Sequence, residues 1–175
     1  YYLTPGFIDV HNDADHSLNL FIDPQQSKFL LQGVTTIIGG NCGSSLAPLL
    51  YGSLESIRKW VNTDQINVNW QTMAEFLSVV QKRGIGVNFG TLVGHSTIRR
   101  ALIGEDRRDL TEKELNVFKS TLEQSLQEGA LGLSTGLSYA HARGVSFREI
   151  KLLAQAVKKY NAWYATHLRS EKEEL

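Results

Sequence analysis

The sequence has little cysteine, no net charge and no long apolar run. A single cysteine cannot form an internal disulfide, which is typical of a reducing compartment, and we expect a cytoplasmic protein. No run approaches the ~20 apolar residues of a membrane-spanning helix, so we expect no membrane association. Lysine plus arginine equals aspartate plus glutamate at 18 each, and the basic residues are scattered, so no nucleic-acid surface is expected.

The composition is that of a globular protein, with 42% hydrophobic and 21% charged residues. A length of 175 residues is enough for one domain with a core of its own and too short for two ordinary domains. The sequence begins with Tyr1 and ends on the charged stretch "SEKEEL". We therefore expect residues 1–175 to be a single incomplete domain that belongs to a longer chain.

Five short apolar or β-branched runs alternate with segments of helical spacing. The runs cover residues 6–10, 33–40, 86–94, 129–134 and 162–167. Repeated alternation of strand and helix is typical of a parallel sheet with helical crossovers. The runs are apolar rather than alternating, as expected for strands that are covered on both faces. The sequence thus predicts an α/β fold with about five β/α units.

The helices predicted between and after these runs cover residues 23–32, 53–61, 69–84, 111–129 and 146–161. The first begins with an Asp-Pro pair, which favours a helix start. Thr111 with Glu114, and Ser146 with Glu149, have the spacing of a capping box, in which two side chains satisfy the free N–H groups of the first turn.

Polar residues follow the ends of all five runs. They are His11, Asp13, Asn41, Cys42, His95, Tyr139 and His167. Both barrels and open α/β sheets place their chemistry at the carboxyl ends of the strands. Convergence from five ends suits a closed ring better than a single crevice, so we expect part of a (β/α)8 TIM-type barrel.

His11 and Asp13 are two residues apart on a strand end, so their side chains point to the same side. Imidazole with carboxylate is a common pair for zinc and related metals. The alternative is a surface turn, because Asn and Asp are frequent turn residues. Asp15 and His16 are interpreted as loop residues.

Cys42 lies in "GGNCGSS", a glycine-rich turn directly after a predicted strand. Three interpretations are open: a metal ligand presented by a bent backbone, a small buried core residue, or part of a phosphate-binding loop. The last lacks both the Lys-Ser/Thr of a P-loop and the G-x-G-x-x-G spacing.

His95 and His167 also follow strands, and each alone is more often a hydrogen-bonded structural residue than a ligand. Tyr139 follows "GLSTGLS" and either contacts a substrate or packs. His141 is interpreted as an exposed loop residue. The arginines outside these motifs are interpreted as surface charges: Arg99, Arg100, Arg107 and Arg108.

Five motifs together resemble the D-aminoacylase (N-acyl-D-amino-acid deacylase) branch of the amidohydrolase superfamily. In chain order they are "PGFIDVH", "GVTTIIGGNCGSSLAPL", "VGHSTIR", "GALGLSTGLSYA" and "ATHLRSE", between Thr4 and Glu171. The resemblance implies a metal-dependent (β/α)-barrel hydrolase that cleaves the linear amide of N-acyl-D-amino acids, with one tightly bound zinc ion and a possible second site.

The resemblance also implies residue roles. Cys42 matches the cysteine that replaces the superfamily's bridging carboxylated lysine, and His167 matches the histidine that holds the tightly bound zinc with it. His11 matches the first histidine of an H-x-H motif, and Tyr139 matches a tyrosine proposed to contact the substrate. No family role transfers to His95.

The sequence departs from the family in two ways. The second histidine of H-x-H is Asp13, a harder and anionic ligand, which would alter affinity or metal choice at the less essential site. The family's next zinc histidine and its catalytic aspartate are expected beyond Leu175, so no general base is expected within residues 1–175. Five strands do not close a barrel, and the unpaired fifth strand would expose an apolar edge. We therefore expect this chain alone to be inactive, and to be either part of a longer chain or stabilised by self-association.

Two alternatives remain open at this point. A cyclic-amide or imide hydrolase of the same superfamily would need a carboxylated lysine at a strand end, and no lysine lies at such a place. A catalytically dead relative that acts as a binding module is suggested only by Asp13.

Overall fold

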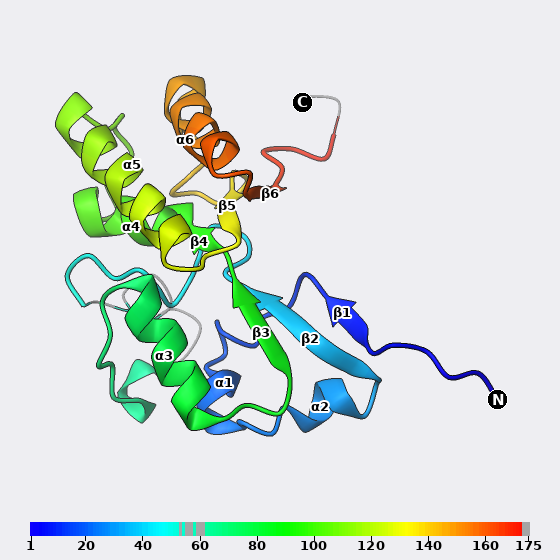
Figure 1. The fold of residues 1–175 in the computed structure, drawn as a ribbon. Helices are drawn as coiled ribbons and strands as arrows, with labels where there is room; N and C mark the ends of the chain where they lie inside the picture. Colours follow the sequence, from blue (N-terminus) through cyan, green and yellow to red (C-terminus); the bar gives the residue numbers. More distant parts are fainter. Residues whose placement is uncertain (53, 55–57, 59–61, 173–175) are drawn as a thin grey trace.

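A computed structural model describes residues 1–52, 54, 58 and 62–172 (Figure 1). Apart from Leu54 and Arg58, the predicted helix 53–61 lies outside the described residues. Within the described residues, strands and helices alternate along the chain and all strand pairs are parallel. The predicted α/β fold with parallel sheets is confirmed.

The strands form two three-stranded sheets. One has the order β1 (Phe7–Asp9), β2 (Val34–Gly39), β3 (Asn88–Thr91), and the other has the order β4 (Val93–Gly94), β5 (Gly132–Gly136), β6 (Trp163–His167). Leu92 alone separates β3 from β4, so the predicted run 86–94 passes from one sheet into the next. Each of the five predicted runs overlaps a strand, although β5 extends to Gly136, two residues past the predicted end, and the two sheets do not close into a ring.

The helices lie between these strands. They are α1 (Asn19–Ile22), α2 (Ser27–Leu30), α3 (Met73–Arg83), α4 (His95–Ile103), α5 (Glu112–Gln127) and α6 (Phe147–Lys159), with a 3-10 helix η1 (Thr63–Gln65). The capping box of Thr111 and Glu114 at the start of α5 is confirmed. In α6 the prediction was half wrong: Ser146 accepts from the Glu149 amide, but the Glu149 carboxylate pairs with His95 instead of returning to the cap.

Two helix predictions need correction. The helix expected from Asp23 begins only at Ser27, because Gln26 has a positive φ of 52° and its side-chain amide donates to the carbonyls of Asp23 and Asn19. The Asp-Pro pair therefore lies in a turn between α1 and α2. Conversely, α4 was not predicted, because it follows β4 directly and its N-cap, Gly94, has no side chain to cap it.

The helices cover the outer faces of the sheets and bury the core there. In Figure 1, α5 and α6 lie side by side over β5, and Phe118, Leu122 and Leu153 are buried between these layers. On the other sheet, Phe76 of α3 packs edge-on against Phe89 of β3, with ring centroids 6.1 Å apart. The carboxyl ends of the strands are thus left available for a site.

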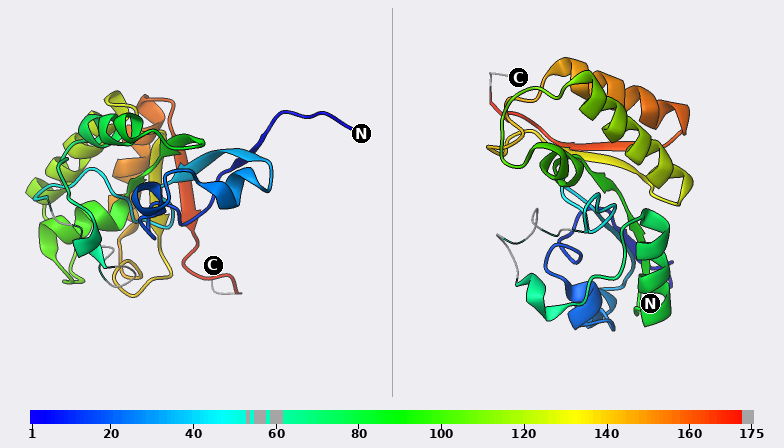
Figure 2. Two further views of the ribbon diagram at one scale, coloured as in Figure 1. Left: turned by 90° about the horizontal axis from the view of Figure 1, so that it is seen from below. Right: turned by 90° about the vertical axis from the view of Figure 1, so that its left-hand side faces the viewer.

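The opposite edges of the two sheets are exposed. Phe7 and Ile8 of β1 are 62% and 63% exposed, and Trp163 of β6 is 54% exposed. Figure 2 shows the N-terminal segment leaving the body of the molecule beside β1. Among the described residues, no helix is both long and apolar enough to cross a bilayer.

Candidate functional site

Cys42 lies in a tight turn that begins where β2 ends. The backbone takes positive φ angles at Gly40 (73°), Cys42 (54°) and Gly43 (81°), a conformation that favours glycine. A side chain at Gly40 would place its Cβ 2.1 Å from the Leu92 carbonyl oxygen. The Ser134 hydroxyl of β5 donates to the Gly40 carbonyl and accepts from the Gly43 amide, so one side chain fixes both ends of the turn.

The loop after β1 is tied to the same turn. The buried Asp15 Oδ2 accepts from the Gly40 amide at 2.6 Å, and His16 Nε2 donates to the Ser44 carbonyl at 2.8 Å. Burial raises the pKa of the Asp15 carboxyl, although the Gly40 bond and the nearby His16 oppose the shift. Asp15 and His16 were interpreted only as loop residues. The sequence did not reveal their structural role, which is to hold the Cys42 turn in place by hydrogen bonds.

The turn brings the Cys42 thiol next to two of the predicted ligands. The Sγ atom lies 3.3 Å from His11 Nε2 and 4.0 Å from His167 Nδ1. In a tetrahedral zinc site, ordinary bond lengths put a ligand sulfur and a ligand nitrogen about 3.6 Å apart. The two observed separations bracket that value, and thiolate with imidazole is a donor set suited to zinc.

The described residues do not by themselves complete a metal site. Within them, no group of three His, Cys, Asp or Glu side chains is arranged to hold an ion. The Asp13 side chain is 79% exposed, and its Oδ1 lies 3.3 Å from His16 Nδ1 rather than against the thiol. Any ion held by Cys42 therefore needs a further ligand or a small rearrangement.

Burial and charge set the protonation of the thiol. Burial raises the pKa of Cys42, a hydrogen bond from Tyr139 lowers it, and the charge of Asp13 raises it again. Burial and the nearby Cys42 charge also raise the pKa of Tyr139. Both groups are thus protonated at neutral pH when no cation is bound, and the thiolate needed for metal binding forms with release of a proton.

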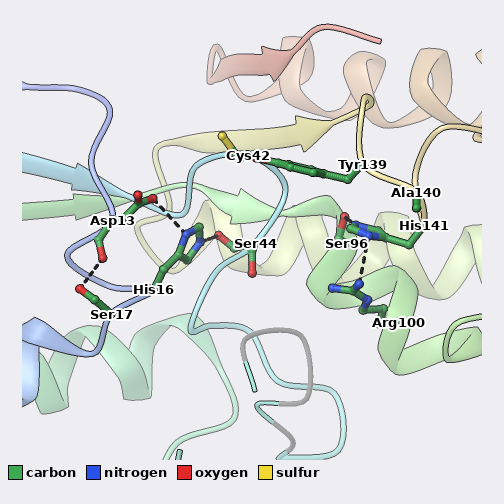
Figure 3. A pocket seen from close by; sticks show the side chains of 10 residues that line it. All are labelled: Asp13, His16, Ser17, Cys42, Ser44, Ser96, Arg100, Tyr139, Ala140 and His141. Carbon is green, nitrogen blue, oxygen red and sulfur yellow. Dashed lines mark hydrogen bonds and ion pairs between the residues drawn. The ribbon is translucent and has the colours of Figure 1, made fainter. Parts of the chain in front are cut away.

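A cavity of about 470 Å³ opens beside the thiol (Figure 3). Its lining comprises Asp13, His16, Ser17, Cys42, Ser44, Ser96, Arg100, Tyr139, Ala140 and His141. The Tyr139 ring lies edge-on to His167 at 5.2 Å and stacks on His141 at 6.1 Å, both between ring centroids. The cavity is large enough for a small organic molecule.

Several residues that line the cavity were missed or misplaced in the sequence analysis, among them Ser96, Arg100 and His141. Ser96 was not singled out, Arg100 was expected on the surface, and His141 was expected to be exposed. In the structure His141 is half-buried, and the Arg100 side chain is only 12% exposed. Recognition of α4 would have revealed part of this, because Ser96 and Arg100 are four residues apart and share one helix face.

His95 points away from this cavity. It is fully buried, its Nε2 lies 2.7 Å from Glu149 Oε1, and its ring packs on Phe118. The structural interpretation of this histidine is confirmed. Arg99 was expected at the surface and is instead 3% exposed, 3.7 Å from the same carboxylate. Asn41 is also structural, since its buried amide donates to the Ile38 carbonyl.

Comparison with known proteins identifies the family. The family model for the amidohydrolase family matches residues 2–175, so the chain belongs to that family. Its relatives include the D-aminoacylase of Alcaligenes xylosoxydans xylosoxydans, 32% identical over 99% of this chain, and the N-acyl-D-aspartate deacylase of the same organism, 34% identical over 99%.

Solved structures of deacylases from the same family also resemble this chain. A crystal structure of D-aminoacylase superimposes with a TM-score of 0.83 at 32% identity over 97% of this chain. The N-acyl-D-glutamate deacylase of Bordetella bronchiseptica, in complex with zinc and a phosphonate mimic of the tetrahedral intermediate, gives a TM-score of 0.80 at 26% identity over 97%. A further D-aminoacylase structure concerns a binuclear metal centre, with activation by one metal and attenuation by the second.

This chain aligns with only part of the length of each relative. This chain covers 35% of the D-aminoacylase and 34% of the N-acyl-D-aspartate deacylase, and 35% of each of the three solved chains. The chain thus spans about a third of the proteins it resembles.

Proposed function

We propose that this chain is the N-terminal part of a (β/α)8 barrel hydrolase that uses zinc to cleave the linear amide of N-acyl-D-amino acids. The observation that carries the proposal is the closeness of the Cys42 thiol to both His11 Nε2, at 3.3 Å, and His167 Nδ1, at 4.0 Å. Membership of the amidohydrolase family and the likeness to deacylases of N-acyl-D-amino acids support it. A cytoplasmic location stays a prediction that rests on the single cysteine.

Cys42 and His167 would hold the tightly bound ion, and His11 with Asp13 would serve a second site. When bound, zinc polarises an acyl carbonyl and lowers the pKa of an attacking water toward ~7. The remaining zinc histidine and the general base are expected beyond Leu175, and residues 1–175 would then form one incomplete domain.

Tyr139 would orient the substrate. The phenol is protonated at neutral pH, so once zinc holds the Cys42 sulfur its hydroxyl can donate a hydrogen bond to an acyl or carboxylate oxygen instead of to the thiol. Its edge-on contact with His167 and its stacking on His141 restrict the ring to one position beside the thiol. A fixed donor next to the reacting carbonyl favours one substrate orientation, which an enzyme acting on one enantiomer requires.

The experiment compares zinc content and deacylase activity in the full-length protein that contains this chain. We expect zinc to co-purify and N-acetyl-D-amino acids to be hydrolysed in preference to their L-enantiomers. Cys42→Ala should lose both zinc and activity, whereas Asp13→Ala should retain the tightly bound ion. Zinc content measured by mass spectrometry reports on the site independently of turnover.

Two other results would replace this proposal. A dead relative that serves as a binding module would take up no zinc even at saturating supply, and Cys42→Ala would change nothing. Hydrolysis of hydantoins or cyclic imides without turnover of linear amides would indicate the cyclic-amide alternative. The cavity lining counts against the latter, because no lysine occurs among its described residues.

A further inference from the structure

The part of the cavity formed by α4 and the loop after β5 contains a cluster of hydrogen-bonding side chains that the proposed metal chemistry does not use. Figure 3 shows Ser96, Arg100 and His141 together on the far side of Tyr139 from Asp13. Arg100 Nη2 lies 3.0 Å from His141 Nδ1, and His141 Nε2 lies 2.6 Å from Ser96 Oγ. We call these three residues the Arg100 cluster.

The hydrogen bonds fix the role of each member. A guanidinium only donates, so His141 Nδ1 accepts from Arg100 and the imidazole proton resides on Nε2. That proton is donated to Ser96 Oγ, which leaves the Ser96 hydroxyl hydrogen as a donor. The cluster therefore combines a positive charge with a hydroxyl donor, the combination that binds a carboxylate.

The charge of Arg100 is placed to act inside the cavity. Arg100 is the one arginine or lysine among the described residues that line it, and its side chain is 12% exposed. Its Nε lies 2.9 Å from Glu105 Oε1, but Glu105 is 58% exposed and does not line the cavity. This ion pair contacts the guanidinium from outside the cavity lining.

The position of Arg100 along α4 indicates which carboxylate of an N-acyl amino acid it would contact. The Ser96 amide donates to the Gly43 carbonyl at 2.7 Å, so the start of α4 touches the Cys42 turn. Arg100 is one helical turn farther along, about 5–6 Å. In an N-acyl amino acid whose amide lies at the thiol, a side-chain carboxylate reaches farther from the amide than the α-carboxylate does.

Resting on the proposed function, we propose that the Arg100 cluster binds the side-chain carboxylate of an N-acyl-D-amino acid and so selects acidic substrates of the aspartate or glutamate type.

The test measures binding as well as turnover in the full-length, zinc-loaded protein. The ligands are the N-methylsulfonyl derivatives of D-glutamate and D-glutamine, which have nearly the same shape, differ in charge and carry a sulfonamide in place of the acyl amide that the enzyme would cleave. We expect the glutamate derivative to bind more tightly. Arg100→Met should weaken its binding about 10- to 100-fold, the range of a charge-assisted hydrogen bond, and should leave the glutamine derivative unchanged.

Two further variants complete the design. Arg107→Met removes an arginine at an exposed position outside the cavity lining and should change neither affinity. Arg100→Lys keeps the charge but loses the planar fork, so it should fold and give an intermediate affinity for the glutamate derivative.

Equal binding of the two derivatives, or an equal loss of both in Arg100→Met, would overturn the inference. The second result would assign Arg100 to the α-carboxylate or to the fold. Hydrolysis of N-acetyl-D-glutamate and N-acetyl-D-leucine, measured in parallel, separates this outcome from failure of the proposed function. If neither is hydrolysed, the proposed function fails, while the binding measurements still decide the role of Arg100.

Discussion

The Asp15 carboxylate is buried at the base of the candidate site. It is 1% exposed, and its Oδ2 accepts from the Gly40 amide. Burial raises its pKa above 3.8, so the folded chain binds this proton more tightly than the unfolded chain. The stability contributed by the protonated form is complete below pH 3.8 and is lost as the pH rises through the folded-state pKa.

We therefore predict that Asp15→Asn gains stability relative to the wild type as the pH rises. Asparagine keeps the oxygen that accepts from Gly40 and cannot ionise. Urea unfolding at several pH values between 4 and 8 gives the difference in free energy of unfolding between the two proteins. A difference that is independent of pH would contradict the prediction, whatever its sign. Asp15→Ala, which leaves the Gly40 amide unpaired, should lose about 1–3 kcal/mol.

At the residue scale, the sequence was informative where a motif is local. Glycine on both sides of the Cys42 turn predicted a bent backbone, and the positive φ angles at Gly40 and Gly43 confirm it. The sequence was uninformative where two contacting residues are far apart in the chain. His141 meets Ser96 across 45 positions, and no spacing rule connects two residues so far apart.

At the scale of elements, the start of α5 depends on one carboxylate. Glu114 accepts hydrogen bonds from the Arg108 guanidinium and from the Thr111 amide, and these contacts lower its pKa to about 2. Because the folded-state pKa is depressed, its contribution is present above pH 4.5 and is lost as the pH falls toward about 2. We predict that Glu114→Gln is less stable than the wild type at pH 6 and that the difference vanishes near pH 2.

Thermal unfolding followed by circular dichroism at both pH values measures this effect. Thr111→Ala should cost about 1 kcal/mol at pH 6, as for other N-cap losses, and less near pH 2, because the Thr111 hydroxyl also donates to the Glu114 carboxylate. A difference between Glu114→Gln and the wild type that persists at pH 2 would show that the charge is not the cause.

The contact between α4 and α6 gives a larger predicted effect. Glu149 is 1% exposed and lies 2.7 Å from His95 Nε2 and 3.7 Å from Arg99 Nε. Glu149→Gln would leave the buried Arg99 cation without its counter-ion, a change that costs roughly 3–5 kcal/mol in other buried pairs. Glu112→Gln removes a pair with Arg148 in which both side chains are about 65% exposed, and it should cost less than about 1 kcal/mol.

Urea unfolding of the two glutamine variants measures both losses. Similar stabilities would show that the buried pair contributes no more than a surface pair. The same carboxylate explains why the cap of α6 was half wrong. Ser146 and Glu149 have the spacing of a capping box, but Glu149 has a buried partner in α4, a helix that the sequence did not reveal.

At the scale of the whole molecule, the arrangement of strands leaves apolar surface uncovered. Within the described residues, β1 pairs only with β2 and β6 pairs only with β5. Phe7, Ile8 and Trp163 on these strands are more than half exposed. The parallel pairing of the strands was predictable from the alternation of runs and helices, whereas a closed ring requires strands that five runs do not supply.

We predict that residues 1–175, expressed alone, self-associate and show no deacylase turnover. Free edges of β1 and β6 offer unpaired N–H and C=O groups beside apolar side chains, which favours pairing with a second copy. Sedimentation velocity over a range of protein concentrations should show a mass above 19.6 kDa that rises with concentration. The substitutions Ile8→Lys and Trp163→Lys should reduce this association, because charge on an edge strand opposes pairing.

A monomer whose mass does not change with concentration would show that the exposed strand edges do not mediate association. Turnover of N-acetyl-D-amino acids by the same sample would show that the residues expected beyond Leu175 are not needed for catalysis.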